Sequence, residues 1–189
     1  MKRKRFIVPL LLLALFGLPH PSSGQSISQK YAKANRLFAQ GHYPEAVRSY
    51  QSLLSPPSRD LDPGVLHTRI ADSYFHLADY NHAIEAYRRA LNVQKTSEQA
   101  QTQYWIGFCD FLLGRDAEAV TEFMKIPQSY PASGMWVGTA YYWAGRASER
   151  MGRKEQAAAF YRKAGGSGKT TQERFAMKKA EGVKNLSTK

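Results

Sequence analysis

The sequence contains a single cysteine, Cys109, among its 189 residues. One thiol excludes an intramolecular disulfide framework and any zinc site that is held by several cysteines. The histidines that follow the N-terminal segment, at positions 42, 67, 76 and 82, form no His-x3-His pair. We therefore expect neither a metal site nor a cofactor.

Other patterns typical of enzymes are missing as well. No run alternates apolar and polar residues with β-branched side chains, so we expect no β-sheet. No segment resembles a nucleophile elbow, and we predict that the chain is not an enzyme. Residues 165–170 read Gly-Gly-Ser-Gly-Lys-Thr, but a phosphate-binding loop requires glycine where Lys163 stands, so no nucleotide is expected.

The N-terminal segment has the three parts of a secretory signal peptide. Residues 2–5 are all basic, residues 6–18 are mostly apolar, and small residues end the segment at Gly24. We predict that residues 1–24 are a signal peptide that is cleaved after Gly24. The alternative is a retained membrane anchor, although the apolar run is shorter than the ~20 residues that span a bilayer. Gln25 stands where a lipoprotein has cysteine, so we expect an exported protein, periplasmic or secreted, without a lipid anchor.

Acidic residues are scarce, with 15 against 27 lysines and arginines. Residues 25–145 are neutral overall, whereas residues 146–189 carry twelve cations and four acids. A cationic segment attracts anionic lipid headgroups, acidic proteins and nucleic acids. An anionic surface is therefore one possible partner for residues 146–189, and we do not expect nucleic acid to be the partner of an exported chain.

Four similar segments follow one another at a period near 37 residues. Each has a turn with Gly or Ala and then an Ala-x-x-x-aromatic pattern, which places both groups on one face of a helix. The aligned alanines are Ala46, Ala83, Ala119 and Ala157. Small residues also precede each turn, at Ala34, Ala71, Gly107 and Gly145. Each unit therefore predicts two antiparallel helices that approach closely where side chains are small.

This pattern resembles the tetratricopeptide repeat (TPR), a helix-turn-helix unit of about 34 residues. The resemblance implies an all-α solenoid of about four repeats within residues 25–171, at about 27–60, 64–97, 100–133 and 138–171. Residues 172–189 are expected to form a capping helix and a basic tail, because a solenoid end exposes apolar surface unless it is capped.

In TPR proteins the first helices of the repeats line a concave groove, so the resemblance implies that this groove binds a protein or peptide. The expected groove residues are Tyr31, Asn35, Phe38, Asp72, Phe75, His76, Tyr104, Phe108, Phe111, Tyr142, Arg146 and Arg150. Arg146 and Arg150 share a helix face and are expected to bind a carboxylate. The alternative is that many of the aromatic residues belong to the core and that the arginines are solvated.

A finer comparison with the family bears on the partner. Chaperone-binding members hold a C-terminal carboxylate with a Lys-Asn-Asn-Lys-Arg clamp. Only Asn35 matches this clamp, and the other positions hold Tyr31, Arg69, Gln101 and Trp105. Binding of that chaperone tail is therefore not expected.

The Tyr-Pro-x-Ser turn at 130–133 and the Ala-Tyr-Tyr-Trp-x-Gly helix at 140–145 resemble periplasmic TPR proteins of Gram-negative bacteria. These are of the Tol-Pal coordinator and outer-membrane assembly type. We therefore expect a non-catalytic adaptor in the bacterial cell envelope. The alternative is a module that binds polyanions or anionic membrane surfaces through its basic C-terminal segment.

Overall fold

The computed structural model describes residues 26–166 and 171–187. The predicted signal peptide and most of the Gly-rich stretch at 165–170 lie outside these ranges. Within them the chain forms nine α-helices and no strand. The helices are α1 (Ile27–Ala39), α2 (Tyr43–Gln51), α3 (Pro63–His76), α4 (Tyr80–Leu91), α5 (Thr96–Leu112), α6 (Asp116–Ser129), α7 (Gly134–Arg150), α8 (Lys154–Gly165) and α9 (Thr171–Ser187). In the described part of the chain, none of them is both long and apolar enough to cross a membrane.

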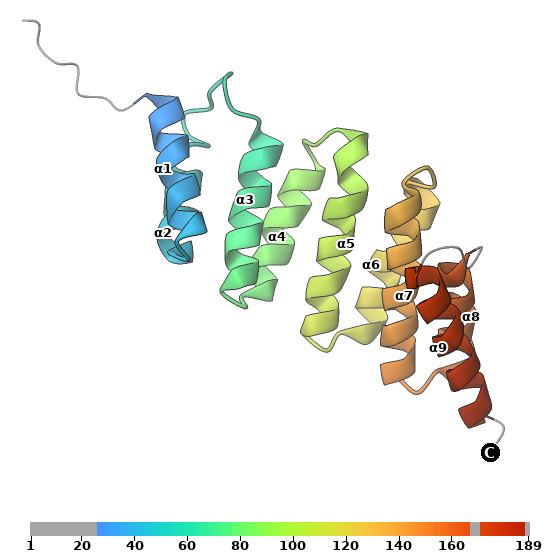
Figure 1. The fold of residues 1–189 in the computed structure, drawn as a ribbon. Coiled ribbons are helices and arrows are strands. Elements are labelled where there is room, and N and C mark those ends of the chain that lie inside the picture. Colours follow the sequence, from blue (N-terminus) through green and yellow to red (C-terminus); the bar gives the residue numbers. More distant parts are fainter. Residues whose placement is uncertain (1–25, 167–170, 188–189) are drawn as a thin grey trace, which may run out of the picture.

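The helices form a solenoid in which each packs against the next along the chain (Figure 1). Four antiparallel pairs, α1–α2, α3–α4, α5–α6 and α7–α8, are followed by α9, which packs against α8 and α7. The first helices α5 and α7 also contact each other directly. Equivalent helices of neighbouring pairs come closest on the inner side of a curved stack. The first helices of the pairs therefore form the concave layer, and the second helices form the outer layer. The predicted all-α helix-turn-helix solenoid with a final capping helix is confirmed.

Each helix pair turns at an equivalent residue with positive φ. Gly41, Gly114 and Gly152 have φ values of 79°, 76° and 74°, and Ala78 has a φ of 56° at the matching position of the second pair. This left-handed conformation suits glycine, which has no Cβ, better than alanine. The Gly or Ala that the sequence places before each second helix therefore reverses the chain.

The small residues of the repeat lie where the two helices of a pair meet. Ala46, Ala83, Ala119 and Ala157 are all fully buried. The aromatic residue four positions later is buried as well, and in the last two pairs its ring lies directly against a glycine of the first helix. A Cβ added to Gly107 would lie 2.9 Å from the Phe123 ring, and one added to Gly145 would lie 2.7 Å from the Tyr161 ring. These two pairs therefore pack closer than a methyl group allows.

Polar contacts join successive repeats, and each of three links spans 34 residues. Arg88 Nη2 lies 3.4 Å from Glu122 Oε1. Arg115 Nη2 donates a hydrogen bond to Asn81 Oδ1 at 2.8 Å, and Arg150 Nε donates one to Asp116 Oδ1 at 2.8 Å. Each link connects a residue to a position one repeat further along the chain. Such spacing is what a stack of similar units requires, because the same face meets its neighbour in every repeat.

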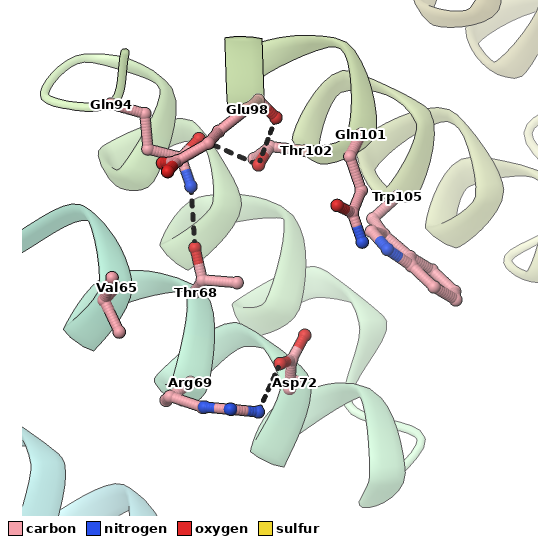
Figure 2. A pocket seen from close by; sticks show the side chains of 9 residues that line it. All are labelled: Val65, Thr68, Arg69, Asp72, Gln94, Glu98, Gln101, Thr102 and Trp105. Carbon is pink, nitrogen blue, oxygen red and sulfur yellow. Dashed lines mark hydrogen bonds and ion pairs between the residues drawn. The ribbon is translucent and has the colours of Figure 1, made fainter. Parts of the chain in front are cut away.

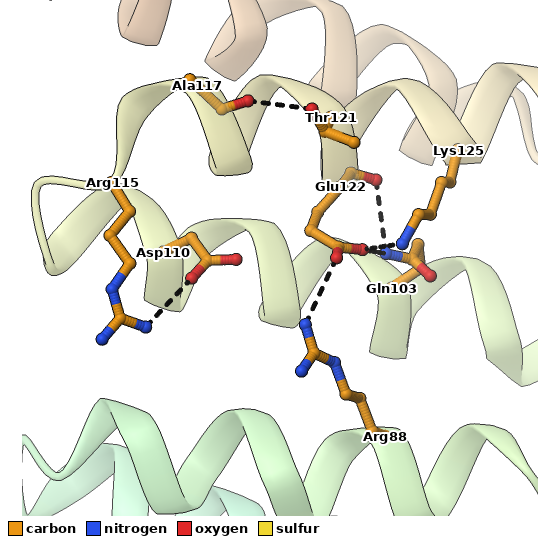
Figure 3. Close-up of polar contacts among 8 residues, drawn as sticks. All are labelled: Arg88, Gln103, Asp110, Arg115, Ala117, Thr121, Glu122 and Lys125. Carbon is orange, nitrogen blue, oxygen red and sulfur yellow. Dashed lines mark hydrogen bonds and ion pairs between the residues drawn. The ribbon is translucent and has the colours of Figure 1, made fainter.

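Glu122 is the centre of one of these networks (Figure 3). It is only 8% exposed and accepts hydrogen bonds from Gln103 Nε2 and Lys125 Nζ, each at 2.6 Å. Burial alone would raise the pKa of Glu122, but these hydrogen bonds and the nearby Arg88 outweigh it and hold the pKa below its usual value. The ionised carboxylate is thus satisfied between α4, α5 and α6.

The contact between Gly145 and Tyr161 can be tested with two alanine substitutions in α7. Gly145→Ala is expected to lower the free energy of unfolding by about 1–2 kcal/mol, because the added methyl group must displace a buried ring. Gly138→Ala gains the same helix propensity, but its Cβ meets only the Ala164 carbonyl at 4.0 Å, so a rise of up to ~1 kcal/mol is expected. Urea unfolding followed by circular dichroism measures both. A rise in both variants would contradict the packing constraint.

Candidate functional site

Aromatic rings connect the first helices along the concave layer. We call the set that makes contacts between neighbouring first helices, and with α9, the aromatic ladder. Its contacts, by ring-centroid distance, are Phe38–His76 at 5.4 Å, Phe75–Phe108 at 6.2 Å, Phe108–Trp143 at 4.8 Å and Tyr142–Phe175 at 6.1 Å. Edge and offset ring contacts of this kind stabilise a fold by more than the burial of their apolar area accounts for. The ladder therefore joins all the repeats and forms part of the groove surface.

The predicted groove aromatics fall into two groups. Tyr104 and Phe111 are only 8% and 9% exposed, and they belong to the core under α6 and α7. The others are half-buried, with part of each ring accessible; these are Tyr31, Phe38, Phe75, Phe108 and Tyr142. For Tyr104 and Phe111 the structure thus matches the core interpretation, and they leave little surface for a partner.

Two polar positions of the groove are held by the tyrosines of their own repeats. Asn35 Oδ1 accepts a hydrogen bond from the Tyr50 hydroxyl, and Asp72 Oδ1 accepts one from the Tyr87 hydroxyl, both at 2.7 Å. Both tyrosines are 1% exposed or less. The buried ring of the second helix therefore fixes the orientation of the polar side chain on the first helix.

The two predicted groove arginines lie in different surroundings. The Arg150 guanidinium binds both carboxylate oxygens of Asp116 and the Phe111 carbonyl, and it lies 3.9 Å above the Phe111 ring. The carboxylate that Arg150 binds is thus part of the chain, and the contact joins the fourth repeat to the third. Arg146 is half-buried, and its guanidinium lies 5.9 Å from the Trp143 ring. The predicted shared carboxylate site is therefore not formed by this pair.

His76, the remaining predicted groove residue, is exposed at the end of α3. Its ring stacks on Tyr43 with centroids 4.7 Å apart and a plane angle of 4°. His76 therefore connects the second repeat to both helices of the first. Among residues 26–166 and 171–187, no group of three or more potential metal ligands comes together.

A cleft of about 340 Å³ opens between α3 and α5, and we call it the α3–α5 cleft (Figure 2). It is lined by Val65, Thr68, Arg69, Asp72, Gln94, Glu98, Gln101, Thr102 and Trp105. Of the groove residues named above, Asp72 lines this cleft. Arg69, Gln101 and Trp105 occupy positions of the chaperone-type clamp, and that alignment was the one sequence signal that pointed to them.

A glutamine fixes one side of the α3–α5 cleft. Gln94, in the loop before α5, donates through Nε2 to Thr68 Oγ1 at 2.9 Å, and its Oε1 accepts from Thr102 Oγ1 at 2.8 Å. These bonds satisfy three polar side chains and hold α3 and α5 at a fixed spacing (Figure 2). The cleft is therefore formed before any partner arrives.

Asp72 is the most buried of the three charged residues that line the cleft. Burial raises the pKa of its carboxyl above the ordinary 3.8, although the Tyr87 hydrogen bond and the charge of Arg69 act in the opposite direction. The Arg69 guanidinium is 3.8 Å from Asp72 Oδ2, at the long end of ion-pair distances. The partners that the chain itself supplies therefore do not fully compensate the burial of this carboxylate.

Models of the tetratricopeptide repeat match residues 66–97, 101–133 and 138–164. This chain contains tetratricopeptide repeats. The matched segments cover most of the second, third and fourth helix pairs, and the TPR interpretation of the sequence is thereby confirmed. No curated protein matches the sequence.

Solved TPR structures are similar to this chain in fold. The apo form of RapI has a TM-score of 0.70 at 12% identity, over 85% of this chain and 64% of RapI. MamA from Desulfovibrio magneticus RS-1 has a TM-score of 0.60 at 16% identity, over 87% and 97%. A Rap protein complexed with Competence and Sporulation Factor has a TM-score of 0.52 at 15% identity, over 74% and 42%. The chain thus spans less than two thirds of the Rap proteins, and at these identities the likeness shows the TPR fold alone.

The charge of Asp72 is expected to cost stability at neutral pH. Because the folded-state pKa is raised, the folded chain binds this proton more tightly than the unfolded chain does. The contribution of Asp72 to the free energy of unfolding therefore falls as the pH rises from about 3.8 through the folded pKa, and it stays lowered at pH 7.

Asp72→Asn removes this cost and keeps an acceptor for the Tyr87 hydroxyl. At pH 7 the variant should be more stable than the wild type, and the difference should shrink as the pH falls below the pKa of Asp72. Urea unfolding between pH 3 and pH 7 measures the effect. A wild type that is the more stable protein at pH 7 would refute it.

Proposed function

We propose that this chain is a non-catalytic TPR scaffold whose concave groove binds a protein or peptide partner. The α3–α5 cleft carries this proposal, because it is open on the layer of first helices and held open by the Gln94 bonds. It adjoins the aromatic ladder, since the Trp105 ring lies 5.2 Å from Phe75. Rigid rings beside adaptable polar groups are typical of surfaces that bind polypeptides, because the rings lose little entropy on binding.

The complex of a Rap protein with Competence and Sporulation Factor supports this proposal in general terms. It shows that a fold of this kind forms complexes.

We further propose that the protein acts in the bacterial cell envelope after export, as a periplasmic or secreted protein. Two sequence features support this location: the signal-peptide pattern of residues 1–24 and the Tyr-Pro-x-Ser turn at 130–133. In the structure this turn connects α6 to α7, and Tyr130 packs against the core of the third and fourth repeats. The resemblance to Tol-Pal coordinator and outer-membrane assembly proteins supports the same compartment.

Binding of an anionic surface through residues 146–189 is the weaker hypothesis. Several cations of this segment already have partners within the chain. Arg150 binds Asp116, Lys179 lies 3.1 Å from Glu149, and Lys163 Nζ lies 5.3 Å from the Tyr141 ring. These contacts reduce the charge that the segment presents to a polyanion, so we favour the groove.

Blocking the cleft should abolish capture of the partner. Gln101 is exposed on α5 and lines the cleft, so Gln101→Trp should fill the space without disturbing the core. Glu85→Trp adds the same ring to the exposed side of α4 and serves as the control. In pull-downs from envelope extract, proteins captured by the wild type and by Glu85→Trp should be missing with Gln101→Trp.

The ionic strength separates the two hypotheses. Capture through the groove should persist at ~0.5 M salt, where long-range electrostatic attraction is screened. Capture that is lost in salt, or lost on deletion of residues 172–189 while Gln101→Trp has no effect, would instead support the anionic-surface hypothesis.

Export predicts a defined N-terminus. When the full chain is expressed in a Gram-negative host, N-terminal sequencing of the periplasmic fraction should begin at Gln25. A full-length protein in the membrane fraction would support the retained anchor, and a full-length protein in the cytoplasm would refute export.

A further inference from the structure

We propose that the α3–α5 cleft is a specificity pocket for a basic side chain, lysine or arginine, of an extended peptide. This inference rests on the proposed function and adds to it the chemistry of the bound segment. It follows from which side chains of the cleft already have partners and which do not.

The charges in the cleft favour a cation. One cation, Arg69, and two carboxylates, Asp72 and Glu98, line it. Arg69 already lies near two electron-rich groups, since its guanidinium is 3.8 Å from Asp72 and 5.8 Å from the centre of the Phe38 ring. The Glu98 side chain pairs with no cation among the described residues. The cleft therefore carries a net negative charge that a basic ligand would neutralise.

The half-buried carboxylate of Asp72 is the stronger of the two acidic groups in this argument. Asp72 Oδ1 accepts a hydrogen bond from the Tyr87 hydroxyl, while Oδ2 forms only a long ion pair with Arg69, at 3.8 Å. A second cation at normal ion-pair distance would supply the partner that burial demands, because a partly desolvated charge gains more from pairing than an exposed one. Asp72 thus provides affinity, and Glu98, which is exposed and also lines the cleft, adds attraction.

The uncharged lining suits the rest of such a residue. Trp105 is half-buried, and Val65 is 38% exposed, so both offer apolar surface to the methylene stem of a lysine or arginine. Gln101 is exposed, and its amide makes no hydrogen bond with the other residues that line the cleft (Figure 2). An amide both donates and accepts, which matches the alternating groups of an extended peptide backbone.

An acidic ligand fits the same cleft poorly. A carboxylate that reached Arg69 would lie close to Asp72, which already pairs with that guanidinium, and Glu98 would add to the repulsion. The experiment therefore includes acidic peptides, whose preference would reverse the assignment.

The test uses peptide pools that differ at one residue. Short peptides with blocked ends carry a fixed central lysine, Nε-acetyl-lysine, arginine or glutamate, and every other position is randomised among uncharged residues. The pools are passed over the immobilised full chain, and the retained peptides are measured by mass spectrometry. Lysine and acetyl-lysine differ mainly in charge, so their ratio isolates the electrostatic contribution. We expect the lysine and arginine pools to be retained about tenfold more than the acetyl-lysine pool, and the glutamate pool least.

Asp72→Asn combined with Glu98→Gln should bring the lysine to acetyl-lysine ratio close to one. The double variant is expected to fold, because Asn35 at the matching position of the first repeat already accepts the same tyrosine hydrogen bond. Circular dichroism checks its fold. Glu85→Gln removes an exposed carboxylate from α4, outside the cleft, and should leave the ratio unchanged.

The outcomes separate this inference from the proposed function. Equal retention of the lysine and acetyl-lysine pools, a preference for glutamate, or a preference that survives the double variant would overturn the basic-residue pocket. If peptides bind without charge preference and Gln101→Trp abolishes that binding, the groove function stands and only the pocket assignment fails. If no pool is retained and Gln101→Trp changes no capture from envelope extract, both fail.

Discussion

Small residues on the first helix of each pair and an aromatic ring on the second are buried together where the two helices cross, and this close packing sets the spacing on which the structure depends. The contact is tightest at Gly107 and Gly145, where a Cβ would overlap the ring of Phe123 or Tyr161. A ring that is buried this deeply has little room to shift in a close-packed interior, and this restricts where the two helices can cross. The groove and the links between repeats are built from pairs that all bury small residues and an aromatic ring in this way.

The same rings also decide the chemistry of the groove. In the first two repeats the ring is a tyrosine, and its hydroxyl binds Asn35 or Asp72 on the concave layer. In the third repeat the ring is Phe123, and the matching groove position is Phe108, which contacts other rings instead. A buried hydroxyl needs a polar partner, whereas a phenyl ring needs none. Over the first three repeats the core residue and the groove residue therefore change together.

Asp72 illustrates how a binding surface differs from a core. Its carboxylate accepts one hydrogen bond and lies near one cation, and burial still raises its pKa. Glu122 shows the contrast, because two short hydrogen bonds satisfy it on the outer layer and its pKa is lowered. The charged side chains that join repeats, such as Glu122, are fully paired within the chain. In the cleft, the Asp72 carboxylate can still accept a further cation. This is the arrangement expected where a surface retains binding energy for a ligand.

The sequence by itself determined the helices, the turns and the repeat, because these follow from local spacing: Gly or Ala at each turn, and Ala-x-x-x-aromatic on one face of each second helix. It also predicted an aromatic concave layer. It did not separate buried Tyr104 and Phe111 from accessible Phe75, because burial depends on the neighbouring repeat. Only the tertiary structure showed that Arg150 binds Asp116 and that Asp72 meets Glu98 and Trp105 in one cleft. Those residues belong to successive repeats, and they become neighbours only when the helix pairs stack on one another, which no local pattern in the sequence encodes.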